Sequence, residues 1–193
     1  MNTPELNFPA WNSNSFRTHC GLLVDANNIQ PQDIKIWDIA ASLSKICRFA
    51  GHIPVFYSVA EHSVFDYGEV YRMGGNYEER ISALLHDATE MFVGDCPTPF
   101  KKLIPGFSAL EDKLYEAIAT QFKIPTTIPD IVREADHKVY ELEAKNFHNY
   151  SNINRQWRNS LIYCLQPHEA EKLYIATFNR EINSLPDVPI KKV

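Results

Sequence analysis

Apolar residues recur along most of this chain at the three- and four-residue spacing of amphipathic helices. Between residues 36 and 49, for example, Ile36, Ile39 and Leu43 fall on one helical face. The same periodicity predicts helices over residues 36–49, 55–70, 77–92, 131–150 and 168–185, and a short helical segment around 157–165. It predicts another helix after Gly106, with its apolar face between residues 110 and 122. We therefore expect a mostly α-helical protein.

Residues 16–25 carry the only extended pattern. FRTHC and LLVD flank Gly21, and Thr18 and Val24 favour extended backbone, so this stretch predicts a short β-hairpin. Residues 94–99 contain two prolines and one glycine, which argues against a regular helix there. Residues 1–14 are polar and proline-containing, and we expect them to be irregular.

The chain is long enough for one substantial hydrophobic core, since 45% of its 193 residues are hydrophobic. We expect a single domain over residues 1–193, with its core at 16–150 and C-terminal helices at 151–185. The net charge of -5 argues against a surface for a nucleic-acid polymer. Neither a secretory signal pattern nor an apolar run of about 18 residues is evident, and the four cysteines form no CxxC pair. These features predict a cytoplasmic protein with reduced thiols and no membrane contact, located in the host cytoplasm if a phage encodes it.

Histidine and aspartate residues in three predicted helices suggest a metal site. His86 and Asp87 follow an apolar helical run, His62 lies in the preceding helix, and Asp136 lies in a later one. Two imidazoles with two carboxylates suit one divalent transition metal such as Co²⁺, Mn²⁺, Fe²⁺ or Zn²⁺. Four protein ligands leave open positions for a water and a substrate oxygen, which metal-assisted hydrolysis requires.

The pattern H…HD…D, formed by His62, His86, Asp87 and Asp136, resembles the HD-domain metal-dependent phosphohydrolases. The segments SVAEHS and LLHDATEMFVGDCPTPFK are similar to the 5′-deoxynucleotidase branch of that superfamily and its phage and prophage relatives. The similarity extends from about residue 16 to residue 147. It implies an all-α fold, an HD-domain helical bundle with the metal at its centre, to which the residue pattern adds a small N-terminal β-hairpin.

The resemblance also implies roles for residues around the metal. Glu90, three residues after the HD aspartate, stands where the family has a glutamate that acts in catalysis. Asp95, in the GDCPTP segment, matches an aspartate that holds the sugar. Arg48 and Phe49 match an arginine and an aromatic residue that contact phosphate and sugar, although the nucleotidases have tryptophan at the second place. We thus expect Glu90, Arg48 and Asp95 to take part in catalysis. Arg48 and Asp95 should also bind substrate, together with Phe49.

Two further residues are candidates for substrate contacts. Lys101 follows PTPF and could contact a phosphate, or could simply be solvated. His52 could line the pocket beside Arg48, or could be a hydrogen-bonded loop residue. His137 follows a candidate ligand but points about 100° away from it on a helix, so we expect it to face outward.

Together these features predict hydrolysis of the 5′ phosphate ester of a 2′-deoxynucleotide, giving deoxynucleoside and phosphate from a monophosphate. One alternative is a dNTP (dATP) triphosphohydrolase that releases triphosphate and depletes a deoxynucleotide pool in a phage. Another is a non-catalytic regulator that binds nucleotide. Members of the family are often dimers or larger, so we expect a homo-oligomer; the apolar C-terminal helix with Tyr174 and Phe178 could be an interface, or ordinary core.

Overall fold

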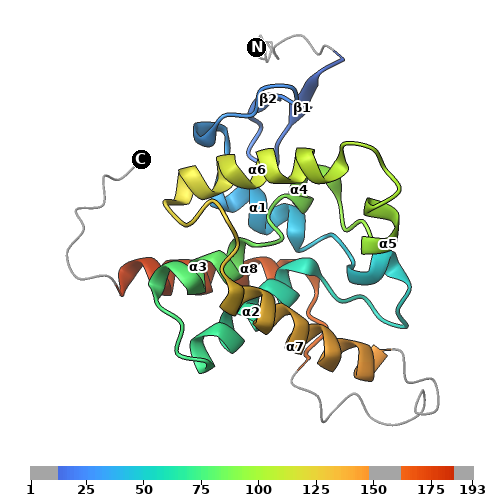
Figure 1. Ribbon diagram of the computed structural model, residues 1–193, viewed down its shortest axis with the longest axis vertical. Helices are drawn as coiled ribbons and strands as arrows, with labels where there is room; N and C mark the ends of the chain where they lie inside the picture. The colour runs from blue at the N-terminus through green and yellow to red at the C-terminus, as the bar shows by residue number, and fades with distance from the viewer. Residues whose placement is uncertain (1–12, 148–161, 185–193) are drawn as a thin grey trace, which may run out of the picture.

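The computed structural model describes residues 13–147 and 162–184, and this part of the chain is mostly helical with one small antiparallel sheet. The predicted helical class and the N-terminal hairpin are therefore confirmed. Strand β1 (Ser15–Arg17) pairs with β2 (Leu23–Asp25), with Phe16 opposite Val24. Figure 1 shows this hairpin at one end of the molecule and α7 near the other.

Most of the helical segments predicted from the hydrophobic periodicity contain a helix, although several bounds differ. In chain order the helical elements are η1 (Pro31–Asp33), α1 (Ile36–Leu43), η2 (Arg48–Gly51), α2 (Val59–Arg72), α3 (Tyr77–Leu85), α4 (Glu90–Val93), α5 (Thr98–Lys101), α6 (Phe107–Phe122), α7 (Asp130–Phe147) and α8 (Pro167–Asn183). The predicted segment at 157–165 falls mostly outside the described residues, and residues 162–165 are not helical.

Helix α2 lies at the centre of the fold. The side chain of Ser58 caps its N-terminus by accepting a hydrogen bond from the Glu61 backbone N–H, which satisfies one of the free donors of the first turn. The helix packs against α1, α3, α7 and α8. Because it is surrounded on several sides, α2 buries polar as well as apolar residues, among them His62 and Asp66.

The helix predicted over 77–92 is broken, which corrects the prediction. Helix α3 ends at Leu85, and α4 starts only at Glu90. At the break, His86 Nδ1 lies 2.7 Å from the Ala83 carbonyl oxygen, which an α-helix would offer to the N–H of residue 87. The next backbone bonds span three residues instead of four, as from Glu90 N–H to Asp87 O. The side chain of His86 thus competes with the backbone N–H of Asp87 for the Ala83 carbonyl, and the helix ends there.

The helix predicted over 36–49 ends earlier in the structure, and the helix predicted over 55–70 begins later. Helix α1 ends at Leu43, and α2 begins only at Val59. Between them, Cys47 and Ser58 form an isolated antiparallel bridge, and Arg48 N–H donates to the Tyr57 carbonyl. This pairing fixes the backbone of Arg48 beside the start of α2.

One helical turn occupies part of the segment predicted to be irregular. Helix α5 (Thr98–Lys101) begins inside residues 94–99. Pro99 lies in its first turn, where a residue without an N–H removes no helical hydrogen bond. The prolines therefore delay the helix without preventing it.

Helix α8 packs on α1, α2 and α3 and is part of the core. Tyr174 is fully buried, and its hydroxyl donates to the Leu84 carbonyl at 2.7 Å. Phe178 packs edge-on against Phe122, with ring centroids 5.5 Å apart. Core packing thus accounts for both aromatic residues that were candidates for an interface. None of the helices in the described part of the chain combines the length and the apolarity of a membrane span.

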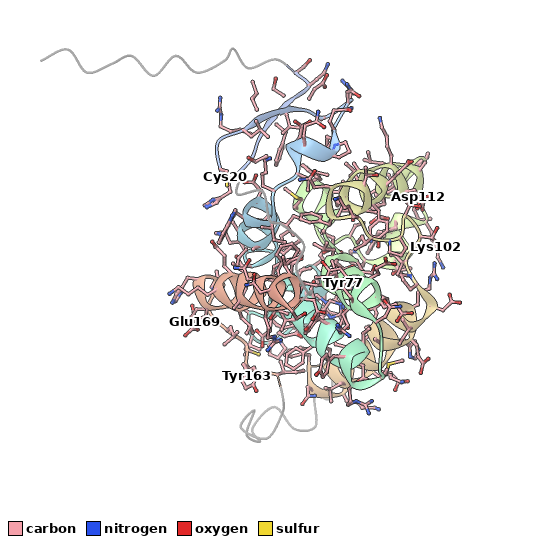
Figure 2. The ribbon with its side chains drawn as sticks, turned by 90° about the vertical axis from the view of Figure 1, so that its left-hand side faces the viewer. Cys20, Tyr77, Lys102, Asp112, Tyr163 and Glu169 are labelled. Carbon is pink, nitrogen blue, oxygen red and sulfur yellow. The ribbon has the colours of Figure 1, made fainter. Side chains whose placement is uncertain are left out.

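The segment that leads into α8 is held by Glu61 of α2. Its buried carboxylate accepts hydrogen bonds from the backbone N–H groups of Tyr163, Cys164 and Leu165 at 2.8–2.9 Å. Figure 2 shows Tyr163 at the end of the molecule opposite the hairpin, and Glu169 at the outer edge of α8. The residue immediately before His62 therefore fixes the start of the last helix.

Candidate metal centre

Four side chains bring their donor atoms within 4.8 Å of one another: His62, Asp66, His86 and Asp136. Helix α2 provides His62 and Asp66, which are one turn apart on the same face. His86 lies directly after α3, and Asp136 lies in the second turn of α7. Three of the four predicted ligands are in this group, and Asp66 is an addition that the sequence analysis missed.

The fourth predicted ligand, Asp87, reaches the same two imidazoles. Its Oδ2 lies 3.4 Å from His62 Nε2 and 3.3 Å from His86 Nε2. The same oxygen lies 3.3 Å from Arg48 Nη1, so the arginine also attracts this carboxylate. All four predicted ligands therefore come together.

The separations of the donor atoms fit a shared ion. His62 Nε2 is 2.9 Å from Asp66 Oδ2 and 3.4 Å from Asp136 Oδ1, and His86 Nε2 is 3.3 Å from Asp66 Oδ2. Two donors that are each about 2.1 Å from one metal ion are about 3.0 Å apart at a right angle and about 3.4 Å apart at the tetrahedral angle. The observed distances cover this range.

Hydrogen bonds fix the orientation of both imidazoles. His62 Nδ1 lies 2.7 Å from Glu143 Oε1, and His86 Nδ1 lies 2.7 Å from the Ala83 carbonyl. A carboxylate and a carbonyl can only accept, so Nδ1 carries the proton in each ring. Both Nε2 atoms are buried and have no hydrogen-bond partner among the described residues. In the neutral form of each ring a lone pair on Nε2 faces carboxylate oxygens, an arrangement that a proton on Nε2 or a metal cation between the groups would stabilise.

The pKa values of the cluster also indicate that a positive charge is favourable there. Burial alone lowers the pKa of His86, but the Asp87, Asp66 and Asp136 carboxylates outweigh burial and raise it to about 10. Burial raises the pKa of Asp87, but the two histidines outweigh it and hold that pKa well below its usual range. The cluster therefore favours positive charge at its centre.

Glu143 of α7 supports His62 from behind. It is fully buried, and it accepts hydrogen bonds from the Tyr57 hydroxyl at 2.8 Å and from Arg48 Nη2 at 3.3 Å. Glu143 follows Asp136 by seven residues, which is two turns on one helical face. A single face of α7 thus provides a carboxylate at the cluster and a second one that holds the His62 ring.

The cluster borders two cavities. One, of about 660 Å³, is lined by the predicted substrate residues Arg48, Phe49, Glu90, Asp95 and Lys101, among others. The other, of about 800 Å³, lies toward α6, and its lining includes His86, Thr89, Lys113 and Tyr115. Asp87, Lys101 and Arg133 line both cavities.

Glu90 and Arg48 line the smaller cavity beside Asp87. Glu90 is 3% exposed, and its Oε2 has no hydrogen-bond partner. Burial, Asp87 and Asp95 together raise the pKa of Glu90 to about 9. Arg48 is held between Asp87 and Glu143, at 3.3 Å from each, so its guanidinium is fixed where it enters the cavity lining.

The remaining predicted substrate residues lie around this pair. Asp95 Oδ2 accepts a hydrogen bond from the Ala50 N–H at 3.3 Å, which ties the GDCPTP segment to η2. Lys101 Nζ is paired with Glu111 at 2.7 Å, and its side chain still contributes to both cavities. His52 is exposed and does not line either cavity.

Two curated relatives are similar to this chain. The uncharacterized protein YfdR of Escherichia coli is 42% identical over 110 residues, which cover 57% of this chain and 59% of YfdR. The uncharacterized protein RCAP_rcc00048 of Rhodobacter capsulatus is 35% identical over 140 residues, 68% of this chain and 71% of that protein. The chain belongs to the family of RCAP_rcc00048. The match to YfdR spans less than two thirds of that protein's length. No protein-family model matches the chain.

In this member of the RCAP_rcc00048 family, the sequence analysis missed three residues of the site. Asp66 follows His62 at the i, i+4 spacing, and this spacing could have revealed it. Glu143 shares a helical face with Asp136, which is a weaker signal. Tyr57, which donates to Glu143, lies outside regular structure, so no periodic pattern indicates it. The side chain of His137 is 72% exposed, as the prediction of an outward-facing residue requires, but His137 also lines the smaller cavity, which was not predicted.

Proposed function

We propose that this protein is an HD-domain metal-dependent phosphohydrolase of the 5′-deoxynucleotidase branch. The observation that carries the proposal is the pair of buried imidazoles, His62 and His86. Each commits Nδ1 to a protein acceptor and turns an unpartnered Nε2 toward carboxylates, beside cavities that also hold Glu90 and Arg48. A purely structural histidine would not need a free ring nitrogen next to three carboxylates.

The residues that would hold the metal are His62, His86, Asp87 and Asp136, with Asp66 close by. Mixed nitrogen and oxygen donors suit Co²⁺, Mn²⁺ or Zn²⁺. When bound, such an ion supplies Lewis acidity toward a phosphate oxygen or lowers the pKa of a coordinated water.

The chain's own side chains supply the other parts of the reaction. Arg48 would pair with a phosphate oxygen and offset its negative charge. Asp95 would accept a hydrogen bond from the sugar, and the Phe49 and Tyr140 rings, 6.0 Å apart between centroids, would form an apolar wall of the same cavity.

With the positive charge of a bound divalent ion offsetting the carboxylates that raise its pKa, Glu90 would be ionised and would orient the attacking water and take its proton. The new bond joins the water oxygen to phosphorus, and the bond that breaks is the one between phosphorus and the 5′ oxygen. The proton is then given to that leaving oxygen. The products are a deoxynucleoside and phosphate.

A triphosphate substrate is the second candidate, because the larger cavity, of about 800 Å³, meets the smaller one at Asp87, Lys101 and Arg133. Its lining adds the cation Lys113 and also the carboxylates Glu111, Asp112 and Glu116, so the space beside the site, and not its charge, supports this candidate. Additional phosphates could extend into it from the same reacting phosphorus. The leaving deoxynucleoside would be the same, and the second product would be triphosphate.

The test is to supply the metal-loaded protein with dAMP, dATP and their ribonucleotide counterparts and to identify the phosphate product by ³¹P NMR. Phosphate from dAMP supports the monophosphatase, and triphosphate from dATP supports the triphosphohydrolase. Glu90→Gln should lower kcat by about 10²- to 10⁴-fold. Glu134→Gln, on the exposed side of α7, is the matched control and should retain activity. A protein that binds deoxynucleotide but releases neither product is instead a regulator.

A further inference from the structure

Asp66 of α2 is a buried carboxylate with no hydrogen-bond partner. Its relative exposure is 0%, and neither carboxylate oxygen has a hydrogen-bond partner among the described residues. Asp66 Oδ2 lies 2.9 Å from His62 Nε2 and 3.3 Å from His86 Nε2. No other described carboxylate oxygen comes as close to His62 Nε2, and at His86 Nε2 Asp66 Oδ2 is as close as Asp87 Oδ2, at 3.3 Å.

A buried carboxylate without donors is unfavourable unless a cation lies beside it. The helical geometry directs Asp66 toward the cluster, because residues four apart lie on the same face of α2. Asp66 Oδ2 faces two ring nitrogens, and the Nδ1 proton of each ring is held on the opposite side. In their neutral form, which is the form that binds a metal, these rings offer Asp66 no hydrogen, so a cation is the partner that stabilises its carboxylate there.

We propose that Asp66 is a fifth protein ligand of the metal, joining His62, His86, Asp87 and Asp136. The inference rests on the proposed metal-dependent function, and it extends that function to the choice of metal. Three carboxylates and two imidazoles form an oxygen-rich shell that leaves a single position of an octahedral ion for water or substrate. This shell favours Mn²⁺, Fe²⁺ or six-coordinate Co²⁺ over Zn²⁺, which prefers four ligands.

The charge around the cluster is consistent with a third carboxylate ligand. Three carboxylates exceed the charge of a divalent ion by one. Arg48 lies 3.3 Å from Asp87 Oδ2, and its guanidinium carries a positive charge. The arginine can therefore balance the extra negative charge at the edge of the shell.

The experiment measures metal binding by the full-length protein, independently of turnover. Dissociation constants for Mn²⁺ and Zn²⁺ are obtained by chelator competition for the wild type, Asp66→Asn and Asp66→Val. Asp38→Asn is the control, since Asp38 is a buried aspartate of α1 that accepts a hydrogen bond from the Cys20 N–H. We expect Asp66→Asn to weaken Mn²⁺ binding by about 10- to 100-fold or more, to weaken Zn²⁺ binding less, and Asp38→Asn to change neither.

The visible spectrum of the Co²⁺ form is the second measurement. The wild type should show the weak absorption of six-coordinate Co²⁺, and Asp66→Val should show the stronger absorption of a lower coordination number. Asp66→Asn keeps the shape of the side chain, so it remains informative if Asp66→Val does not fold. A folded Asp66→Asn variant with wild-type Mn²⁺ affinity and an unchanged Co²⁺ spectrum would overturn the inference. A wild type that binds metal as described but hydrolyses no deoxynucleotide would overturn only the proposed function.

Discussion

Replacement of Glu143 by glutamine tests how the site is held together. Glu143 Oε1 lies 2.7 Å from His62 Nδ1 and 2.8 Å from the Tyr57 hydroxyl, and Oε2 lies 3.3 Å from Arg48 Nη2. All three neighbours donate, and a carboxylate accepts from all of them. An amide has one accepting oxygen and one donating nitrogen, so glutamine must present its NH₂ group either to His62 and Tyr57 or to Arg48.

The first orientation changes the imidazole. With an NH₂ group opposite Nδ1, the His62 ring must carry its proton on Nε2, where a metal would bind. The second orientation leaves the proton of His62 on Nδ1, but it places the NH₂ group, a donor, opposite the Arg48 guanidinium, which can only donate as well. Loss of such a supporting carboxylate usually weakens metal binding by about 10- to 100-fold, which is about 1.4–2.7 kcal/mol. A lost hydrogen bond to a charged group costs about 1.5–3 kcal/mol of unfolding free energy.

The two effects are separated by measuring metal affinity by chelator competition, and urea unfolding in the presence of a chelator. Glu181→Gln is a matched control, because Glu181 also accepts hydrogen bonds from a tyrosine, Tyr67 at 2.6 Å, and from an arginine, Arg80 at 3.0 Å. We expect both variants to lose stability and only Glu143→Gln to lose metal affinity. Wild-type metal affinity in Glu143→Gln, or an equal loss in Glu181→Gln, would refute the reasoning.

Further predictions concern stability. Burial raises the pKa of Glu181, but hydrogen bonds, first of all from Arg80, outweigh it and hold that pKa below its ordinary value of 4.5. This group's contribution to stability is therefore present above pH 4.5 and lost as the pH falls through the folded pKa, so urea unfolding of Glu181→Gln should depend less on pH between about 5 and 3. Tyr174→Phe removes a hydrogen bond to a carbonyl in the last turn of α3, and should cost about 0.5–1.5 kcal/mol in the same assay. Gly94→Ala should lower the free energy of unfolding by about 1–3 kcal/mol, because Gly94 has φ 76° and ψ 168°, which a residue with a side chain rarely adopts. Gly68→Ala, where a Cβ on α2 meets open space, should be neutral or stabilising by up to about 1 kcal/mol. Equal shifts of the melting temperature in the two variants would contradict this.

Hydrophobic periodicity predicted the helices because burial of an apolar face is what forms them. Helix α8 begins and ends within two residues of the predicted bounds. The break after Leu85 was not predictable in this way, because it depends on a side-chain hydrogen bond from His86 to the Ala83 carbonyl. Apolar spacing contains no information about such local competition.

The site was predictable where residue type and spacing coincide with a motif. His62, His86, Asp87 and Asp136 come together from three parts of the chain. Glu143 could not be assigned in the same way, since its partner His62 lies 81 residues away and the contact depends on how α7 packs against α2. Tertiary packing, which the sequence pattern does not specify, decides which carboxylates support the candidate metal ligands.

Helix α2 carries two of the candidate donors, His62 and Asp66, on successive turns of a single helix. The distance between these two side chains is therefore set by the helix backbone and cannot adjust to the ionic radius of the metal. Asp136 and Asp87 approach from separate elements that can shift independently, α7 and the turn after α3. We expect a larger or smaller ion to be accommodated by small movements of these two elements against a fixed α2, so looser packing of α7 would broaden the range of tolerated ions before it abolished binding.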